Sequence, residues 1–132
     1  NYRGITSLCA GSKLMEIIVN TLLINATKGY ISTAQHGFFS GRSTSTNLVD
    51  FISFCKRNME GGGQVDVVYT DLKAAFDRID HRILLAKLDH LGVSCKVVNW
   101  VASYLTGRTL SVKIGASESV PFCMTSGVPQ GS

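Results

Sequence analysis

The stretch VDVVYTDLKAAFD, residues 65–77, joins an apolar segment to a more polar one. Its first half is rich in β-branched and aromatic residues and is too short for a helix, which predicts a largely buried strand over residues 65–71. Asp71 ends this strand, where an ionised carboxylate is costly unless a cation or hydrogen-bond donors meet it. Asp71 is therefore the first candidate for chemistry, and a solvated strand end that caps the next turn is the alternative.

Downstream of this strand, the apolar spacing predicts two helices and a β-hairpin. The first helix is predicted from an Asp80 cap to Gly92, and the second from Ser94 to about Thr106. The outgoing strand, the turn and the return of the hairpin are residues 108–114, 115–117 and 119–123. A sheet covered by helices on one face follows, which is an α+β or mixed α/β arrangement.

Upstream of the strand, two further amphipathic helices are predicted. Ser12 can cap the first, and the second runs from Ser43 to Glu60, where the glycines of residues 61–63 stop it. The apolar faces expected to be buried are Leu14, Ile17, Ile18 and Leu22 in the first helix, and Leu48, Ile52, Cys55 and Met59 in the second. The glycine run is also the predicted boundary between two subdomains.

Bulk composition sets broad limits on function. A length of 132 residues suits one core, and no apolar run reaches the roughly 18 residues of a membrane span, so no membrane partner is expected. A net charge of +4 favours polyanionic partners, although such an excess is common in other proteins too. The four cysteines lack zinc-ligand spacing, and reduced thiols suit an intracellular location, in the nucleus and cytoplasm.

Four blocks of the chain resemble reverse transcriptases and occur in that family's order. Residues 68–77, VYTDLKAAFD, resemble motif A, in which the Asp binds catalytic metal and an aromatic residue follows five positions later. Residues 1–14 and 35–44 are similar to the two fingers blocks, and residues 126–132, SGVPQGS, to motif B. The sequences DLKAAFD and GVPQGS are most similar to those of non-LTR retrotransposon enzymes. Mitochondrial group II intron enzymes are related to these.

The resemblance implies the right-hand polymerase fold of the α+β class, with fingers at residues 1–63 and a partial palm at 64–132. Motif C, with its Tyr-x-Asp-Asp carboxylates, and the thumb are expected outside the chain, so the rest of the polymerase is an expected partner. The implied function is RNA-directed DNA synthesis: deoxynucleoside triphosphates extend a DNA primer on an RNA template, with two Mg²⁺ ions. The chain alone is expected to be inactive. The alternative is a noncatalytic basic module of a decayed element that binds RNA or nothing.

Individual roles also come from the resemblance. Asp71, with the backbone carbonyl of Leu72, is implied to bind Mg²⁺. Phe76 is implied to be the sugar gate, a ring that leaves no room for a 2′-hydroxyl, whereas outside this motif it would be an ordinary core aromatic. The structural residues are expected to be Trp100, Tyr104, His81 and His90.

Five further residues are implied to lie around the nucleotide. Arg3 and Lys13 match fingers positions that close on the triphosphate, and Arg42 could touch the template or the phosphates. Gln130 and Gly131 would border the nucleotide. Considered alone, the cations would be solvated surface charge and the glycine-containing segment simply a turn. The chain departs from the family where Gly replaces the usual Pro at position 4, and Phe the frequent Arg at position 39. The second departure weakens the expected phosphate contact of that loop.

Overall fold

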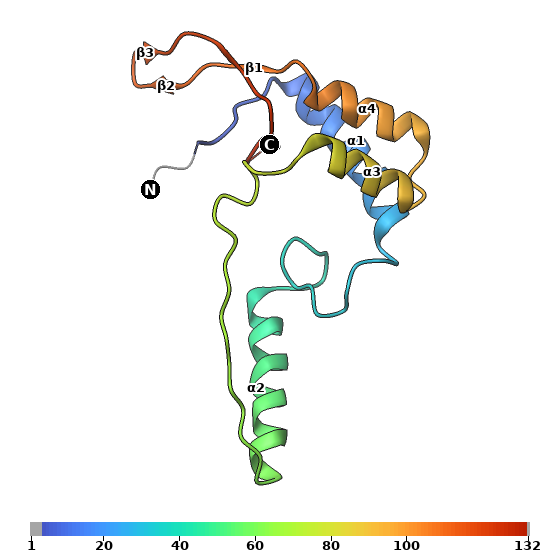
Figure 1. Cartoon of the computed structure of the whole chain (residues 1–132), viewed down its shortest axis with the longest axis vertical. Helices are drawn as coiled ribbons and strands as arrows, with labels where there is room; N and C mark the ends of the chain where they lie inside the picture. Colours follow the sequence, from blue (N-terminus) through green and yellow to red (C-terminus); the bar gives the residue numbers. More distant parts are fainter. Residues whose placement is uncertain (1–3, 132) are drawn as a thin grey trace. The chain divides into compact units, whose positions relative to one another are not determined.

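The computed structural model describes residues 4–131, a mixture of helices and short strands (Figure 1). These residues form two compact units. One consists of the described residues of Asn1–Gly29 and Leu72–Ser132, and the other is Tyr30–Asp71. In the part of the chain that the structure describes, no helix is long and apolar enough to cross a bilayer. The predicted boundary between fingers and partial palm at residue 63 stays a prediction.

Three helices build the core of the first unit. They are α1 (Ala10–Thr27), α3 (His81–His90) and α4 (Cys95–Leu105), and α4 packs against both of the others (Figure 1). Val19, Val101 and Leu105 are buried between them. The half-buried side chains around this core are Leu23, Leu84, Leu85, Leu88, Val97, Trp100, Tyr104 and Val128. The packing interpretation of Trp100 and Tyr104 is therefore confirmed.

Local chemistry sets the limits of α3, as predicted. The Asp80 carboxylate accepts hydrogen bonds from the backbone N–H groups of Arg82 at 2.8 Å and Ile83 at 3.2 Å. These bonds, that of Ile83 first, hold the pKa of Asp80 below its ordinary value. Gly92 follows α3 at φ +75°, a conformation that glycine adopts freely and that ends the helix.

The predicted buried face of α1 is wrong. The side chains expected inside are 48–64% exposed: Leu14, Ile17, Ile18 and Leu22. The helix also begins earlier than a Ser12 cap would allow, because its N-cap is Cys9. Val19 and Leu23 face the core instead. Since α1 carries apolar residues on most of its sides, their spacing predicts a helix but not the side that α4 covers.

The hairpin is confirmed as two short antiparallel ladders. Strand β1 (Thr109–Leu110) pairs with β4 (Phe122–Cys123), and β2 (Lys113–Ile114) pairs with β3 (Ser117–Glu118). Two residues separate β1 from β2 and three separate β3 from β4, so the returning side carries one extra residue. Pro121 lies in this bulge, where its missing N–H leaves no ladder bond unmade.

The second unit contains one helix, α2 (Thr44–Glu60), whose limits agree with the prediction. Ser43 and Thr46 form a reciprocal capping box at its start. The face expected to be buried is largely exposed: Leu48, Ile52 and Met59 are 53–63% exposed. The extended segment after α2 returns beside the helix (Figure 1). The ring centroids of Phe51 and Tyr69 lie 6.4 Å apart.

The predicted buried strand over residues 65–71 is wrong for this structure. The segment is extended, but Val68 and Tyr69 are 85% and 84% exposed, and no strand is assigned there. A strand exists only when a neighbouring strand takes its N–H and C=O groups, and among residues 4–131 none pairs with this segment. The expected helix-covered sheet is accordingly not formed by the described residues.

Replacing Leu105, which is 2% exposed, by Ala should lower the free energy of unfolding by about 2–5 kcal/mol, because it leaves a cavity between α1 and α4. Urea unfolding of the chain measures this. The control is Leu14→Ala at a site that is 60% exposed, where the change should stay within about 0.5 kcal/mol. Equal losses in the two variants would contradict the assigned core.

Candidate functional site

The segment after Asp71 makes a tight turn before α3. The N–H groups of Asp77 and Arg78 both donate to the Ala74 carbonyl, at 3.1 and 3.2 Å. Ala74 has φ +53°, an uncommon value for a residue with a side chain. Phe76 lies on this turn and is 40% exposed. The turn therefore holds Phe76 at the surface of the first unit rather than in its core.

A second loop, residues 126–131, is hydrogen-bonded to this turn. The N–H of Val128 donates to the Phe76 carbonyl at 2.9 Å, and the N–H of Gly127 donates to the Ile79 carbonyl at 2.8 Å. These bonds join positions about fifty residues apart in the sequence. The segments resembling motifs A and B are thus in direct backbone contact.

Two side chains add hydrogen bonds to this junction between the Phe76 turn and the loop of residues 126–131. The Ser126 hydroxyl donates to the Asp77 carbonyl at 3.0 Å. Nε2 of His81 lies 2.7 Å from the Gly127 carbonyl oxygen, so that nitrogen is the donor. No local pattern of residues indicates this role of His81, because its partner is 46 residues away and is a backbone atom.

Gly127 is the closest point of the junction. It is buried and has φ +84°. A Cβ atom there would lie 2.9 Å from the Asp77 Cα and carbonyl oxygen and from the Phe76 carbonyl oxygen. All three of these atoms are backbone atoms rather than the ends of flexible side chains, so only glycine fits.

The N-terminal segment adjoins the far end of the same loop. The N–H of Thr6 donates to the Gln130 carbonyl at 2.8 Å. A Cβ on Gly131 would lie 3.1 Å from Cγ2 of Ile5, so the Ile5 side chain packs close to the Gly131 backbone. Three segments from the two ends and the middle of the chain therefore meet around Phe76 and Gln130 in one unit.

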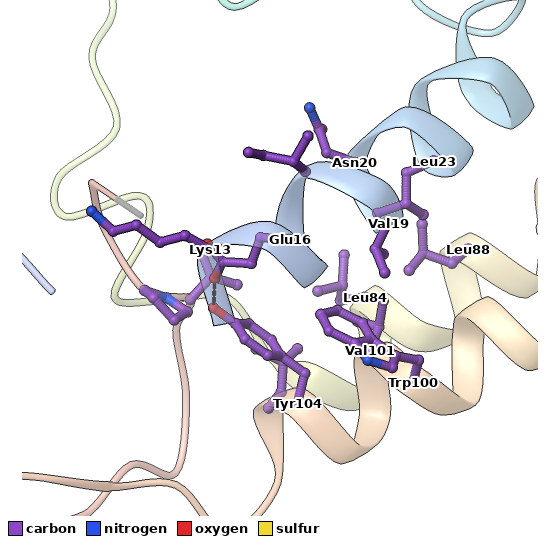
Figure 2. Close-up of a pocket in the computed structure, with 14 residues that line it drawn as sticks. Lys13, Glu16, Val19, Asn20, Leu23, Leu84, Leu88, Trp100, Val101 and Tyr104 are labelled. Carbon is purple, nitrogen blue, oxygen red and sulfur yellow. Dashed lines mark hydrogen bonds between the residues drawn. The ribbon is translucent and has the colours of Figure 1, made fainter. Parts of the chain in front are cut away.

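An apolar groove of about 600 Å³ opens beside this loop, between α1 and α4 (Figure 2). Lys13, Val128 and Pro129 line it. On its wall the Tyr104 hydroxyl donates to Glu16, and burial together with this bond raises the pKa of Tyr104. Lys13 is thus placed in the same unit as Gln130 and Gly131, whereas Arg3 lies outside the described residues.

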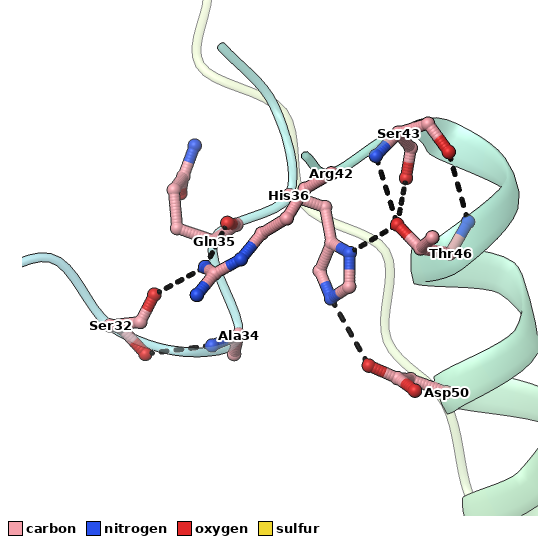
Figure 3. A network of polar contacts seen from close by, with 8 residues as sticks. All are labelled: Ser32, Ala34, Gln35, His36, Arg42, Ser43, Thr46 and Asp50. Atoms are coloured by element: carbon pink, nitrogen blue, oxygen red, sulfur yellow. Dashed lines mark hydrogen bonds and ion pairs between the residues drawn. The ribbon is translucent and has the colours of Figure 1, made fainter. Parts of the chain in front are cut away.

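Arg42 belongs to the second unit, in the loop before α2 (Figure 3). Its Nη1 donates to the carbonyls of Ser32 at 3.0 Å and Gln35 at 2.5 Å. Its guanidinium carbon lies 4.5 Å from the ring centroid of Phe39. Phe39, at the position where the family resemblance implies an Arg, packs against Arg42.

The family profile described as "Reverse transcriptase (RNA-dependent DNA polymerase)" matches residues 1–132. The chain belongs to the reverse transcriptase family. The prediction of that family from the four sequence blocks is confirmed, and the relatives below confirm the non-LTR retrotransposon type. The mixture of helix and strand agrees with the polymerase fold that this family implies.

Three relatives show the kind of reverse transcriptase. The probable RNA-directed DNA polymerase from transposon BS of Drosophila melanogaster is 31% identical over all of this chain, which covers 15% of that protein. The RNA-directed DNA polymerase from mobile element jockey of the same species is 33% identical over all of the chain and 14% of its own length. The Pol polyprotein from the type-1 retrotransposable element R2 of Popillia japonica is 26% identical over 99% of the chain and 18% of its own length. The chain thus spans less than a fifth of these relatives. No solved structure matches it.

Reverse transcriptases usually use a divalent metal, so the oxygen donors of this chain bear on function. Among residues 4–131, no group of three or more His, Cys, Asp or Glu side chains could hold a metal ion. Asp71, exposed at the end of the second unit, offers one carboxylate, and Leu72 a backbone carbonyl. Both are oxygen ligands of the kind that Mg²⁺ takes, but one carboxylate does not complete a two-metal site.

Gly127→Ala should destabilise this reverse transcriptase segment more than Gly92→Ala, by about 1–3 kcal/mol of unfolding free energy, measured in urea. The two glycines have similar positive φ values, +84° and +75°, but nothing lies within 4 Å of a Cβ on Gly92. The difference therefore isolates the collision with Phe76 and Asp77 from backbone strain. Equal destabilisation would show that the two loops are not in close contact.

Proposed function

We propose that the chain forms part of a retrotransposon RNA-directed DNA polymerase that adds deoxynucleotides to a primer 3′-hydroxyl. The observation that carries this proposal is the junction at Gly127, which joins the Phe76 turn to the loop of Gln130 by backbone hydrogen bonds. Those two loops carry Phe76 and Gln130, the side chains that the family resemblance implies to contact the nucleotide. Their direct bonding supports a shared role in holding one ligand.

The chemistry needs positioning and charge neutralisation rather than covalent catalysis. A primer hydroxyl attacks the α-phosphorus in line, and charge develops on the phosphoryl oxygens. Asp71 and the Leu72 carbonyl would supply oxygen ligands to Mg²⁺, which activates the nucleophile and stabilises the leaving oxygens when bound. The remaining carboxylates would come from motif C in the rest of a longer polymerase. The lengths of the relatives support this division.

Phe76 would act as the sugar gate of this polymerase. The hydrogen bond from the Val128 N–H to the Phe76 carbonyl holds the backbone that carries the ring. The ring would then keep the position in which it excludes a 2′-hydroxyl. Gln130 is half-buried, two residues after Val128 in the same loop, and its amide could reach the sugar or base. Gly131 lets the backbone approach closely.

Three cationic side chains would bind the nucleic acid or the nucleotide phosphates. Lys13 and Arg3 would neutralise the triphosphate, and Arg42 would approach the template or the phosphates. Arg42 has five N–H donors, and within residues 4–131 it is Nη1 that donates to the Ser32 and Gln35 carbonyls, so donors on its other nitrogens could serve a ligand. The RNA template and DNA primer would be bound through backbone charge and duplex shape, which suits the net charge of +4.

The proposed division is fingers at residues 1–63 and partial palm at 64–132. Because motif C would come from elsewhere, the chain alone should extend no primer. The proposed setting of the complete enzyme is intracellular, in the nucleus and cytoplasm, where its RNA template is made and its DNA product is inserted.

In a polymerase that carries this sequence in its full reading frame, Asp71→Asn should lower primer extension on an RNA template by about 10³-fold or more, because a neutral amide cannot replace the charged metal ligand. Asp66→Asn is the control, because Asp66 is exposed and hydrogen-bonded to Gln64 at 2.8 Å; it should retain activity. Residues 1–132 alone should extend nothing. Extension by that isolated chain, abolished by Asp71→Asn, would disprove the need for other carboxylates. A full-length protein that binds RNA but extends no primer would favour the noncatalytic basic module.

Phe76→Ala in the same polymerase should raise the incorporation of ribonucleotides relative to deoxynucleotides by about tenfold or more, because the ring no longer excludes the 2′-hydroxyl. Single-nucleotide extension with matched ribo- and deoxynucleoside triphosphates measures the ratio. Phe122→Ala, on the hairpin at a site that is 47% exposed, is the control and should leave the ratio unchanged. An unchanged ratio in Phe76→Ala would remove this residue from the role of sugar gate.

A further inference from the structure

The peptide between Gly127 and Val128 is hydrogen-bonded through both of its polar groups. Its N–H, which belongs to Val128, donates to the Phe76 carbonyl at 2.9 Å. Its C=O, which belongs to Gly127, lies 2.7 Å from the donor Nε2 of His81. Because the atoms of a peptide lie in one plane, a single rigid group connects the Phe76 turn to the start of α3.

The Gly127 carbonyl depends on His81 for its hydrogen bond. Gly127 is buried, and within the described part of the chain no backbone N–H donates to its carbonyl. A buried carbonyl that lacks a donor loses the hydrogen bonds that water gives it in the unfolded chain, and this loss is costly. The imidazole therefore stabilises the present orientation of this peptide.

Glycine at position 127 makes such a hold necessary. The close approach to the Phe76–Asp77 backbone requires glycine, but glycine also tolerates many other backbone angles. The following peptide can therefore turn over unless its polar groups are held. In the reversed orientation, the Val128 N–H would face the Nε2–H donor of His81. The Gly127 carbonyl would face the Phe76 carbonyl, so neither pair could form a hydrogen bond.

The position of His81 is itself fixed by a helix. His81 is the first residue of α3 and is half-buried. The preceding residue, Asp80, caps this helix by accepting hydrogen bonds from the N–H groups of Arg82 and Ile83. Since α3 packs against α4, the imidazole is attached to the packed helices rather than to a free loop.

We propose that His81 is a positioning residue for the incoming nucleotide. It sets the direction of the 127–128 peptide and thereby the place of Gln130 relative to Phe76. This inference rests on the proposed function, in which Phe76 and Gln130 contact the nucleotide. The Gln130 carbonyl also accepts the Thr6 N–H at 2.8 Å, so the loop is held at its far end as well. His81 acts through this loop and does not itself contact the substrate.

The first test replaces His81 by Phe in a polymerase that carries this sequence in its full reading frame. Phenylalanine keeps an aromatic ring but has no donor, so KM for the deoxynucleoside triphosphate should rise by about fivefold or more. The value of kcat should stay within about threefold, because a contact made equally in the ground state and the transition state changes KM alone. Single-nucleotide extension at varied triphosphate concentration measures both constants. The Kd for the primer–template should not change.

Two amide variants separate the hydrogen bond from packing. His81→Gln places an amide N–H donor as many bonds from Cα as Nε2 of histidine, so it should restore KM to within about threefold of the wild-type value. His81→Asn has the same amide on a shorter side chain, so it should raise KM as His81→Phe does. The matched control is His90→Phe, the same change at the exposed last residue of α3, which should leave KM unchanged.

Hydrogen exchange gives a readout that needs no activity. In the same polymerase, the peptide that contains residues 126–131 should exchange faster in His81→Phe and His81→Asn than in the wild type, because the Gly127 carbonyl has lost its donor. His81→Gln and His90→Phe should exchange at the wild-type rate. Mass spectrometry of the proteolysed protein measures these rates.

Two results would overturn the positioning role. One is a wild-type KM in His81→Phe, and the other is a KM raised equally by Gln and Phe, which would indicate that the imidazole ring acts by packing alone. Failure of the proposed function would instead appear in the wild-type polymerase, which would extend no primer. The exchange rates would still show in that protein whether His81 holds the loop, so the two failures are distinguishable.

Discussion

The close approach of Gly127 to the Phe76–Asp77 backbone is the constraint on which the rest of the first unit depends. It fixes the turn that leads into α3, and the loop that it anchors also receives the N-terminal segment through Thr6 and Gln130. Without it, three segments distant in sequence would have no common meeting point. The hydrogen bonds of Val128 and His81 act only because the two backbones can come so near.

In the second unit, an irregular loop is held in place without a surrounding core. Its loop relies on buried or half-buried polar side chains, chiefly His36 and Arg42, whose bonds reach backbone carbonyls and the start of α2. Phe39 completes this arrangement by packing under Arg42. At the position where the family resemblance implies an Arg, this chain therefore has a residue that packs within the loop itself.

Local sequence signals were accurate where one residue determines an outcome. Asp80 predicted the start of α3, Gly92 its end, and the glycines after Glu60 the end of α2. The predicted burial of α1 and α2 failed, because apolar spacing does not say which side a neighbour will cover. Residues 65–71 have every local property of a strand, yet strand formation depends on a partner that no described residue provides.

By itself the sequence determined the family, the helix limits and the identity of Asp71, Phe76 and Gln130 as candidates, since these depend on residue type and short-range order. Only the tertiary structure decided that Gly127 must be glycine, that His81 holds the loop of Gln130, and that Phe39 packs against Arg42. Each of these is a contact between atoms whose separation is set by the packed helices and the loops between them. Such distances are not encoded in any local pattern of residues.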